Sequence, residues 1–150
     1  MVQIDSEATV ADYMATRMIT MGWKESVLDA AKRMIERNIS SIAIMNDENR
    51  IIGIITERDV VKIVANGVPA GGITASSLMS YPVVSIEKGS SIEDAARVMA
   101  KKKLRHLLVE DAGKAIMGII TVTDLARYLK KNLTEEDLAA SEVWELLSQD

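Results

Sequence analysis

The sequence contains no cysteine and a single histidine, His106. Without cysteine the chain can form no disulfide framework, no thiolate metal site and no thiol nucleophile. One histidine cannot supply a multi-histidine metal site. We therefore expect neither a metal centre nor cysteine-based catalysis.

Aromatic residues are scarce, with no Phe, two Trp and three Tyr in 150 residues. The core must therefore be built from Ile, Val, Leu, Met and Ala, and the nine Met make parts of it adaptable. A composition of 48% hydrophobic and 27% charged residues is ordinary for a soluble globular protein. The length predicts one domain, or two half-domains that share a core.

Long apolar runs and a basic start are also missing. The segment Met1–Glu7 carries no positive charge, so it does not resemble a signal peptide, and no stretch approaches the roughly 20 apolar residues of a membrane span. The net charge of −4 disfavours nucleic acid as the main partner, because phosphate binding needs a basic surface. These features predict a cytoplasmic protein with no membrane association.

An internal repeat is the strongest positive feature. Residues 10–66 and 75–131 match at a constant offset of 65 without a gap. A period near 65 is too long for a small solenoid unit and suits a supersecondary block used twice. The matched positions include Met14/Met79, Ser26/Ser91, Asp29-Ala30-Ala31/Asp94-Ala95-Ala96, Met34/Met99, Ile51/Ile116, Gly53-Ile54-Ile55-Thr56/Gly118-Ile119-Ile120-Thr121 and Asp59/Asp124.

Hydrophobic periodicity and turn signals predict the same elements in both copies. The first copy is predicted to contain a helical lead-in at 10–15, strands at 18–21, 41–45 and 51–55, and helices at 26–37 and 57–65. The second is predicted to contain strands at 83–86, 106–109 and 116–120 and helices at 91–102 and 122–131. Each copy therefore reads β-α-β-β-α, which predicts an α/β (α+β) fold.

The predicted organisation has four parts. The first repeat spans 8–66, a linker with Pro69, Gly71 and Gly72 spans 67–74, and the second repeat spans 75–131. A C-terminal tail, 132–150, is expected to form one more helix from Thr134 that docks on the body or on a partner chain.

One motif in each copy could carry chemistry. An apolar strand runs into Thr56 or Thr121, and Asp59 or Asp124 follows three residues later at the start of a helix. Ligands of open sheets bind outside the carboxyl ends of strands, where an acidic residue can accept from ribose hydroxyls. A helix N-terminus there also suits phosphate. The alternative is that Thr-x-x-Asp is only a helix capping box, since the same spacing occurs at Ser26/Asp29, Ser91/Asp94 and Thr134/Asp137.

The two Gly-Ile-Ile-Thr-x-x-Asp motifs, in register within a doubled β-α-β-β-α unit, resemble a tandem pair of CBS domains, also called a Bateman module. The lead-in Val10–Met14, the segment Pro82–Ile86 and the segment Arg105–Val109 also fit this family. The resemblance covers about residues 8–131. It implies two repeats related by pseudo-two-fold symmetry.

The resemblance also implies that adenosine ligands bind in two clefts between the repeats. For the first cleft the corresponding positions are Thr20, Met21, Ser40, Ser41, Ile42, Thr56, Arg58 and Asp59. For the second they are Ser85, Ile86, Arg105, His106, Leu107, Thr121, Thr123 and Asp124. The implied ligands are AMP, ADP or ATP, with S-adenosylmethionine and NAD as further possibilities, and no covalently bound cofactor is required.

The two copies differ ahead of their middle strands. The second carries Lys101, Lys102, Lys103 and Arg105, which would favour a polyphosphate in the second cleft. The alternative is that the lysines are a solvated helix end that complements the helix dipole. His106 is either a ligand contact or a structural histidine.

The sequence shows no catalytic signature of its own. It has no Gly-x-x-x-x-Gly-Lys-Ser/Thr loop, no Gly-x-Gly-x-x-Gly, and no recognisable acid–base pair or Ser-His-Asp set. We predict a non-enzymatic regulatory module that binds adenine nucleotides, forms a homodimer and signals to a separate effector protein. The rival hypotheses are an interaction scaffold with empty clefts and, third, a nucleic-acid-binding protein.

Overall fold

A computed structural model describes residues 8–132 and Leu146 of the chain. The chain divides into two compact units. The central unit comprises residues 18–84. Of the described residues, the terminal unit comprises 8–17, 85–132 and Leu146.

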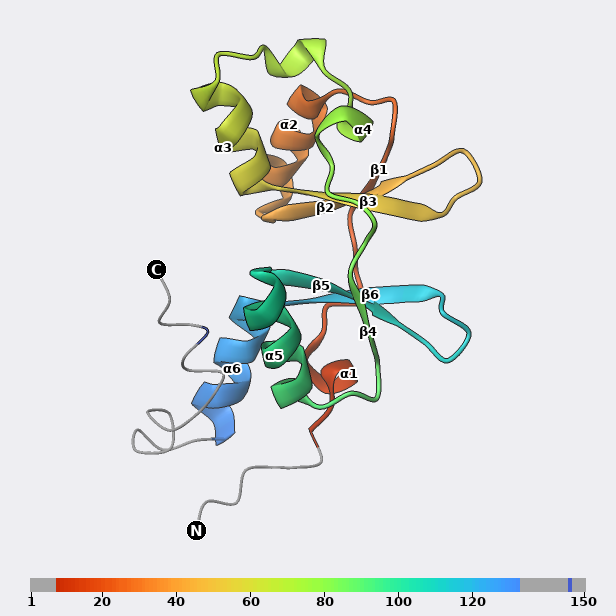
Figure 1. Ribbon diagram of the computed structural model, residues 1–150, viewed down its shortest axis with the longest axis vertical. Coiled ribbons are helices and arrows are strands. Elements are labelled where there is room, and N and C mark those ends of the chain that lie inside the picture. Colours follow the sequence, from red (N-terminus) through yellow and green to blue (C-terminus); the bar gives the residue numbers. More distant parts are fainter. Residues whose placement is uncertain (1–7, 133–145, 147–150) are drawn as a thin grey trace. The chain divides into compact units, whose positions relative to one another are not determined.

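The central unit contains a three-stranded mixed sheet in the order β1-β2-β3. Strand β1 runs parallel to β2, which pairs with β3 in an antiparallel hairpin. The helices α2 and α3 lie on one side of this sheet (Figure 1). The elements are β1 (Thr20–Gly22), α2 (Val27–Arg37), β2 (Ser41–Met45), β3 (Ile51–Thr56), α3 (Glu57–Ala65), the 3-10 turn η1 (Ala70–Gly72) and α4 (Ala75–Leu78).

The terminal unit repeats this plan. Its sheet has the order β4-β5-β6 with the same parallel and antiparallel pairings, and α5 and α6 lie on one side of it (Figure 1). The elements are α1 (Val10–Tyr13), β4 (Ser85–Glu87), α5 (Ile92–Lys102), β5 (His106–Glu110), β6 (Ile116–Thr121) and α6 (Val122–Asn132). The β-hairpins of the two units carry a register shift at equivalent places, Ile44/Met45 and Val109/Glu110.

Each unit combines segments of both sequence repeats. The lead-in helix α1 of the first repeat packs in the terminal unit, where Ala15 pairs with Ile119 of β6. The corresponding helix α4 of the second repeat packs in the central unit, where Ser80 pairs with Ile54 of β3. The beginnings of the two repeats are therefore exchanged between the packing units.

The glycine of each Gly-Ile-Ile-Thr motif is needed where this exchanged segment crosses the sheet. A Cβ atom on Gly53 would collide with the side chain of Met79, with the Met79 Cβ at 2.9 Å. A Cβ on Gly118 would lie 2.6 Å from the carbonyl oxygen of Ala15. Only a residue without a side chain lets the backbone of the crossing segment approach this closely.

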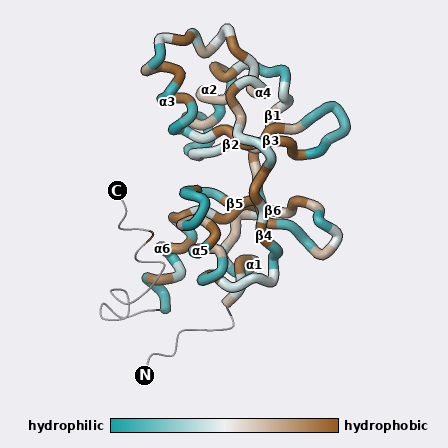
Figure 2. The backbone as a smooth tube through the Cα atoms, viewed as in Figure 1, coloured by the Kyte–Doolittle hydropathy of each residue, from teal (hydrophilic) through white to brown (hydrophobic). Residues whose placement is uncertain are grey.

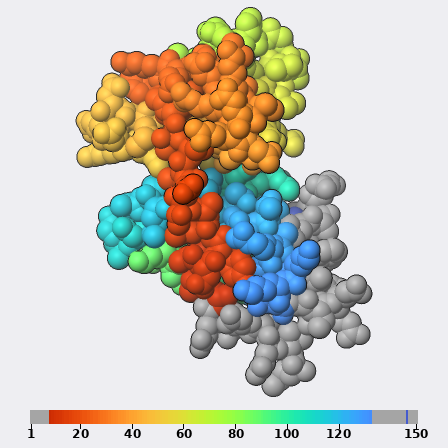
Figure 3. All heavy atoms as spheres, turned by 180° about the vertical axis from the view of Figure 1, so that it is seen from behind, coloured from red at the N-terminus to blue at the C-terminus, as the bar shows by residue number. Residues whose placement is uncertain are grey.

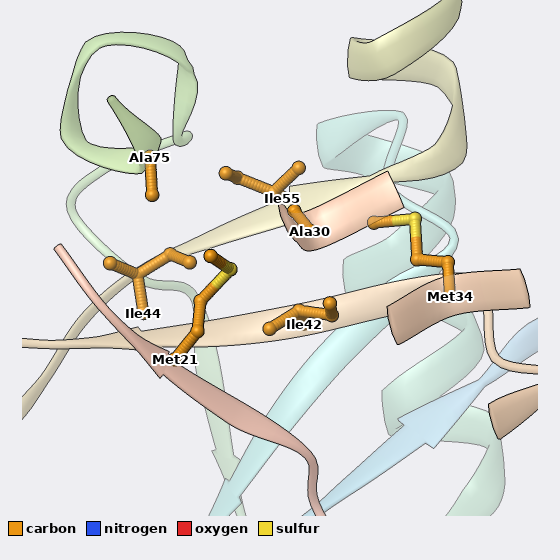
Figure 4. Packing of buried hydrophobic residues seen from close by; sticks show 7 residues of the cluster. All are labelled: Met21, Ala30, Met34, Ile42, Ile44, Ile55 and Ala75. Atoms are coloured by element: carbon orange, nitrogen blue, oxygen red, sulfur yellow. The ribbon is translucent and has the colours of Figure 1, made fainter. Parts of the chain in front are cut away.

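The core of the central unit is aliphatic. Figure 4 shows side chains from β1, β2, β3, α2 and α4 packed together beneath the helices. The cluster consists of Met21, Ala30, Met34, Ile42, Ile44, Ile55 and Ala75. The loop that joins β2 to β3 is hydrophilic, as its teal colour in Figure 2 shows. Burial of alternate strand residues under amphipathic helices stabilises this arrangement through the hydrophobic effect.

The core of the terminal unit contains the aromatic residues Tyr13 and Tyr128. Their rings meet edge to face, with centroids 5.4 Å apart. The hydroxyl of Tyr128 donates to Glu93 at 3.0 Å, and Asn132 Nδ2 donates to the Tyr13 hydroxyl at 3.0 Å. Figure 3 shows the N-terminal segment, in red, lying against α6, in blue. These contacts anchor α1 to α6.

The predicted elements are confirmed, with boundaries that shift by one or two residues. The pattern 26–37 began with Ser26, which is the N-cap of α2 rather than its first residue. The strands predicted at 18–21 and 83–86 are β1 and β4, each of which starts and ends later than predicted. The short helix α4 inside the second repeat was not predicted separately. The helix predicted from Thr134 lies outside the described residues, apart from Leu146, which is helical and buried.

Candidate functional site

The Thr-x-x-Asp motif of the central unit forms a complete capping box at the start of α3. Asp59 Oδ2 accepts hydrogen bonds from the Thr56 backbone N–H at 2.8 Å and from Thr56 Oγ1 at 3.0 Å. The Asp59 N–H donates to Thr56 Oγ1 at 3.4 Å. The capping interpretation of the motif therefore describes this geometry correctly, and such a cap contributes about 1 kcal/mol to stability.

The terminal unit has the same box at the start of α6. Asp124 Oδ2 accepts from the Thr121 N–H at 2.8 Å and from Thr121 Oγ1 at 3.2 Å. The Asp124 N–H donates to Thr121 Oγ1 at 3.4 Å. In both boxes the cap uses one carboxylate oxygen, and the second oxygen, Oδ1, takes no part in it.

The other predicted boxes are only half formed. Ser26 Oγ accepts from the Asp29 N–H at 3.1 Å, and Ser91 Oγ accepts from the Asp94 N–H at 3.0 Å. Among the described residues, neither Asp29 nor Asp94 returns a carboxylate bond to its cap residue, and Asp94 instead pairs with Arg97 at 2.7 Å. The pair Thr134/Asp137 lies outside the described residues. The two motifs that follow an apolar strand are thus structurally distinct from these.

Residues predicted for one ligand site come together at one end of a sheet. In the central unit Ser41 is the register partner of Thr56, and Thr20 lies on the neighbouring strand β1, opposite Ala43. The carbonyl oxygen of Ser40 accepts from the Glu57 N–H at 3.0 Å, which ties this loop to the first turn of α3.

The terminal unit repeats the arrangement. His106 is the register partner of Thr121, and the carbonyl oxygen of Arg105 accepts from the Val122 N–H at 3.1 Å. Ser85 begins the neighbouring strand β4, opposite Leu108. Every residue predicted for the first cleft therefore belongs to the central unit, and every residue predicted for the second belongs to the terminal unit.

Several residues predicted for the two sites have their side chains in the core. The side chains of Met21, Ile42, Ile86 and Leu107 are buried. Each of them sits on a strand next to a more exposed polar residue. Arg58 and Thr123 are exposed in the first turns of α3 and α6, where an anionic group could reach them.

Two details of this sheet end differ from the expected ligand geometry. Only β3 or β6 reaches it with a carboxyl end, while the other two strands of each sheet begin there. In the first turn of α3, the Glu57 and Asp59 N–H groups already bond to Ser40 and Thr56, so the helix N-terminus offers less to a phosphate than the sequence suggested.

The electrostatics of the site are simple. Asp59 and Asp124 are each partly buried, and each accepts a hydrogen bond from the backbone N–H of the threonine in its motif. Among residues 8–132 and Leu146, no cluster of three or more His, Asp or Glu side chains could hold a metal ion. Within the same residues no helix has the length and apolarity needed to cross a membrane.

Comparison with known proteins identifies the architecture. The family model for the CBS domain matches residues 10–66 and 75–131. The chain belongs to the CBS domain family. The family model thus matches the two segments in which the sequence repeats itself.

Three relatives place this CBS domain pair in context. It is 35% identical to the uncharacterized protein MK0525 of Methanopyrus kandleri, over 85% of this chain and 67% of that protein. It is 26% identical to the CBS domain pair of protein MJ0100 in complex with 5′-methylthioadenosine and S-adenosyl-L-methionine, with a TM-score of 0.73 over 83% of this chain and 97% of that one. It is 27% identical to the L-aspartate semialdehyde sulfurtransferase of Methanosarcina acetivorans, over 87% of this chain but 26% of that enzyme.

Proposed function

We propose that this CBS domain pair is a regulatory module that binds an adenine nucleotide, AMP, ADP or ATP, and signals its presence to a separate effector protein. The observation that best supports this proposal is the arrangement of the Asp59 carboxylate. Its Oδ2 is fixed by the cap, while its Oδ1 has no donor among the described residues. A partly buried, oriented acceptor of this kind is suited to the hydroxyls of a ribose.

The surroundings of Asp59 support a nucleoside rather than another diol. The hydroxyls of Thr20 and Ser41 and the main chain of β1 offer donors and acceptors to a base at the same sheet end. The exposed Arg58 supplies a cation for a phosphate. The methylthioadenosine and S-adenosylmethionine bound by the MJ0100 pair share the adenosine moiety, which is the part of the ligand that these residues would read.

The proposed role is regulatory and not catalytic. The carboxylates of the motif and the threonine hydroxyls bonded to them form helix caps, and no second carboxylate or histidine is bonded to either carboxylate in the described residues. A ligand that binds one arrangement of the module more tightly shifts its population toward that arrangement, and a partner protein can read the shift.

We propose a homodimer as the form that transmits the signal. All six exposed large hydrophobic residues in the described part of the chain belong to the central unit. Ile35 on α2 is 85% exposed, and Val61 and Val64 on the adjacent helix α3 are 64% and 66% exposed. The positions equivalent to Ile35 and Val61 in the terminal unit are Ala100 and Ala126. Exposed aliphatic side chains on two helices that contact each other are typical of an interaction surface.

The test of ligand binding is calorimetry and thermal shift with AMP, ADP, ATP, S-adenosylmethionine, 5′-methylthioadenosine and NAD. A ligand at 100 times its dissociation constant should stabilise the fold by about 2.7 kcal/mol. We expect binding by the wild type and its loss in Asp59→Ala. The matched control is Asp29→Ala, because Asp29 occupies the same helix position but lies away from this sheet end.

A scaffold without a ligand is the second candidate, because both capping boxes are complete as they stand. It predicts no thermal shift with any compound of the panel, and full association with the effector after Asp59→Ala. That result would leave Thr56 and Asp59 as helix caps alone.

A further inference from the structure

The two Thr-x-x-Asp sites differ in the state of the second carboxylate oxygen. Asp124 Oδ1 lies 3.3 Å from Arg127 Nη2, an ion pair within the first two turns of α6. The Asp124 side chain is only 13% exposed. Asp59 has no such partner in the described residues, since its counterpart of Arg127 is Lys62, for which no ion pair is found there. A ribose must therefore compete with a cation for Asp124 Oδ1 but not for Asp59 Oδ1.

Arg127 is held in place from its other side. Its Nη2 donates to the carbonyl oxygen of Tyr13 at 2.7 Å, and its guanidinium carbon lies 5.7 Å from the centroid of the Tyr13 ring. Tyr13 is itself buried against Tyr128. In the central unit the residue equivalent to Tyr13 is Leu78. The stacking of a guanidinium on an aromatic ring, as between Arg127 and Tyr13, therefore has no counterpart there. A fixed guanidinium competes more effectively for a carboxylate than a mobile one, because less side-chain entropy is lost.

The base-proximal hydroxyl of the terminal site is also occupied. Ser85 Oγ donates to Glu110 Oε2 at 3.0 Å. The equivalent pair in the central unit is Thr20 and Met45, and a thioether cannot capture the hydroxyl in this way. Glu110 also places a negative charge where an anionic ligand would have to approach.

We infer that Arg127 and Glu110 make the two sites unequal. Arg127 pairs with Asp124 Oδ1 and Glu110 accepts from Ser85 Oγ, and these are two of the groups with which an adenosine ligand would form hydrogen bonds. The ligand therefore binds at Thr56/Asp59 in preference to Thr121/Asp124. The inference rests on the proposed function and adds to it the number of ligands per chain and the residues that set it. This order of affinity is the reverse of the one that Lys101–Lys103 suggested, since those lysines favoured the second site.

The experiment is isothermal titration of the full chain with AMP and, separately, with S-adenosylmethionine. We expect the wild type to bind one ligand tightly per chain, Asp59→Ala to keep only weak binding at the terminal site, and Asp124→Ala to bind as the wild type does. The variant Glu110→Met/Arg127→Lys gives the terminal site the central unit's residues at these two positions. We expect it to bind a second ligand, which Asp124→Ala then removes.

The single variants Arg127→Lys and Glu110→Gln keep the test valid if the double variant does not fold, as judged by circular dichroism. In an Asp59→Ala background, each should raise the affinity of the terminal site by about threefold, the scale of a partly exposed ion pair. Tight binding of two ligands by the wild type would overturn the inference while leaving the proposed function intact. So would a double variant that folds and binds only one. Absence of binding by every variant would overturn both.

Discussion

The carbonyl oxygen of Ala15 lies 2.6 Å from the place that a Cβ atom on Gly118 would occupy. Ala15 also exchanges both backbone hydrogen bonds with Ile119, at 2.8 and 3.0 Å, so the segment cannot easily move away. The glycine of the Gly-Ile-Ile-Thr motif is thus required by the chain that crosses it. It is a packing requirement beside the candidate site.

This relationship predicts the effects of three alanine substitutions on stability. Gly118→Ala should destabilise the fold by about 1–3 kcal/mol, because the methyl group meets backbone. Gly53→Ala should cost less, since most of what it meets is the flexible side chain of Met79. Gly89→Ala is the control, because nothing lies within 4 Å of its added Cβ. Urea denaturation measures all three, and a Gly118→Ala protein as stable as Gly89→Ala would contradict the account.

Removal of the two aspartates should have unequal effects on the protein without ligand. Asp59→Ala removes a capping box, and a loss of about 0.5–2 kcal/mol is expected. Asp124→Ala removes an equivalent box and also the partner of Arg127, so its loss should be larger. Thermal denaturation in buffer alone gives the comparison. Equal losses would show that the pair with Arg127 adds nothing, in line with the weakness of exposed ion pairs.

The pair Glu25–Arg33 predicts a pH dependence. The side-chain hydrogen bond from Arg33 holds the pKa of Glu25 below its ordinary value, and the Gly22 N–H adds to this at 2.6 Å. A carboxyl with a lowered folded pKa stabilises the fold above its unfolded pKa and loses that contribution as pH falls through the folded value. The stability difference between the wild type and Glu25→Gln should therefore be constant near neutrality. It should shrink as the pH falls below about 4.5, the ordinary value for this group.

The measurement is the free energy of unfolding from urea denaturation at a series of pH values. Urea is used because guanidinium chloride is a salt and would screen the Glu25–Arg33 pair. The matched control is Glu48→Gln, whose partner Arg50 lies 3.7 Å away on an exposed loop. A stability difference for Glu25→Gln that persists unchanged at acid pH would show that the ionised carboxylate is not the source.

The aliphatic surface of the central unit predicts the behaviour of a charged substitution. Ile35→Asp should convert the proposed dimer to a monomer, because a carboxylate buried in an apolar contact pays a desolvation cost of several kcal/mol. Ala100→Asp places the same charge at the equivalent position of the terminal unit and should leave the dimer intact. Sedimentation velocity at micromolar concentration distinguishes the two forms. A monomeric wild type would contradict the proposal directly.

Local sequence signals accounted for most elements of the fold. The helix from Glu57 to Ala65 was predicted with both ends correct, because Thr56 and Asp59 cap it and Asn66-Gly67 stops it, with Gly67 at a φ of 68°. The strand Ser41–Met45 was likewise found from its apolar run. Such signals are local, so they survive without knowledge of the tertiary structure.

The candidate site was only partly accessible in this way. The repeat drew attention to Thr56, Asp59, Thr121 and Asp124, and the structure shows that both pairs form the reciprocal caps that were one of the two interpretations. Arg127, Tyr13 and Glu110 were not singled out. Arg127 stands three residues after Asp124, which is a signal that helical spacing could have offered. Tyr13 is separated from Arg127 by 114 residues, and no local pattern joins them.

The sequence by itself determined the repeat, its secondary structure and its family, because hydrophobic periodicity, helix caps and turns each depend on only a few consecutive residues. Only the tertiary structure decided that the lead-in segments are exchanged between the two packing units, with Ala15 against Gly118 and Met79 against Gly53. It also decided that two identical motifs hold their carboxylates differently, since Asp124 meets Arg127 and Asp59 does not. The physical reason is that these arrangements depend on segments far apart along the chain, including Tyr13, which holds Arg127 from 114 residues away.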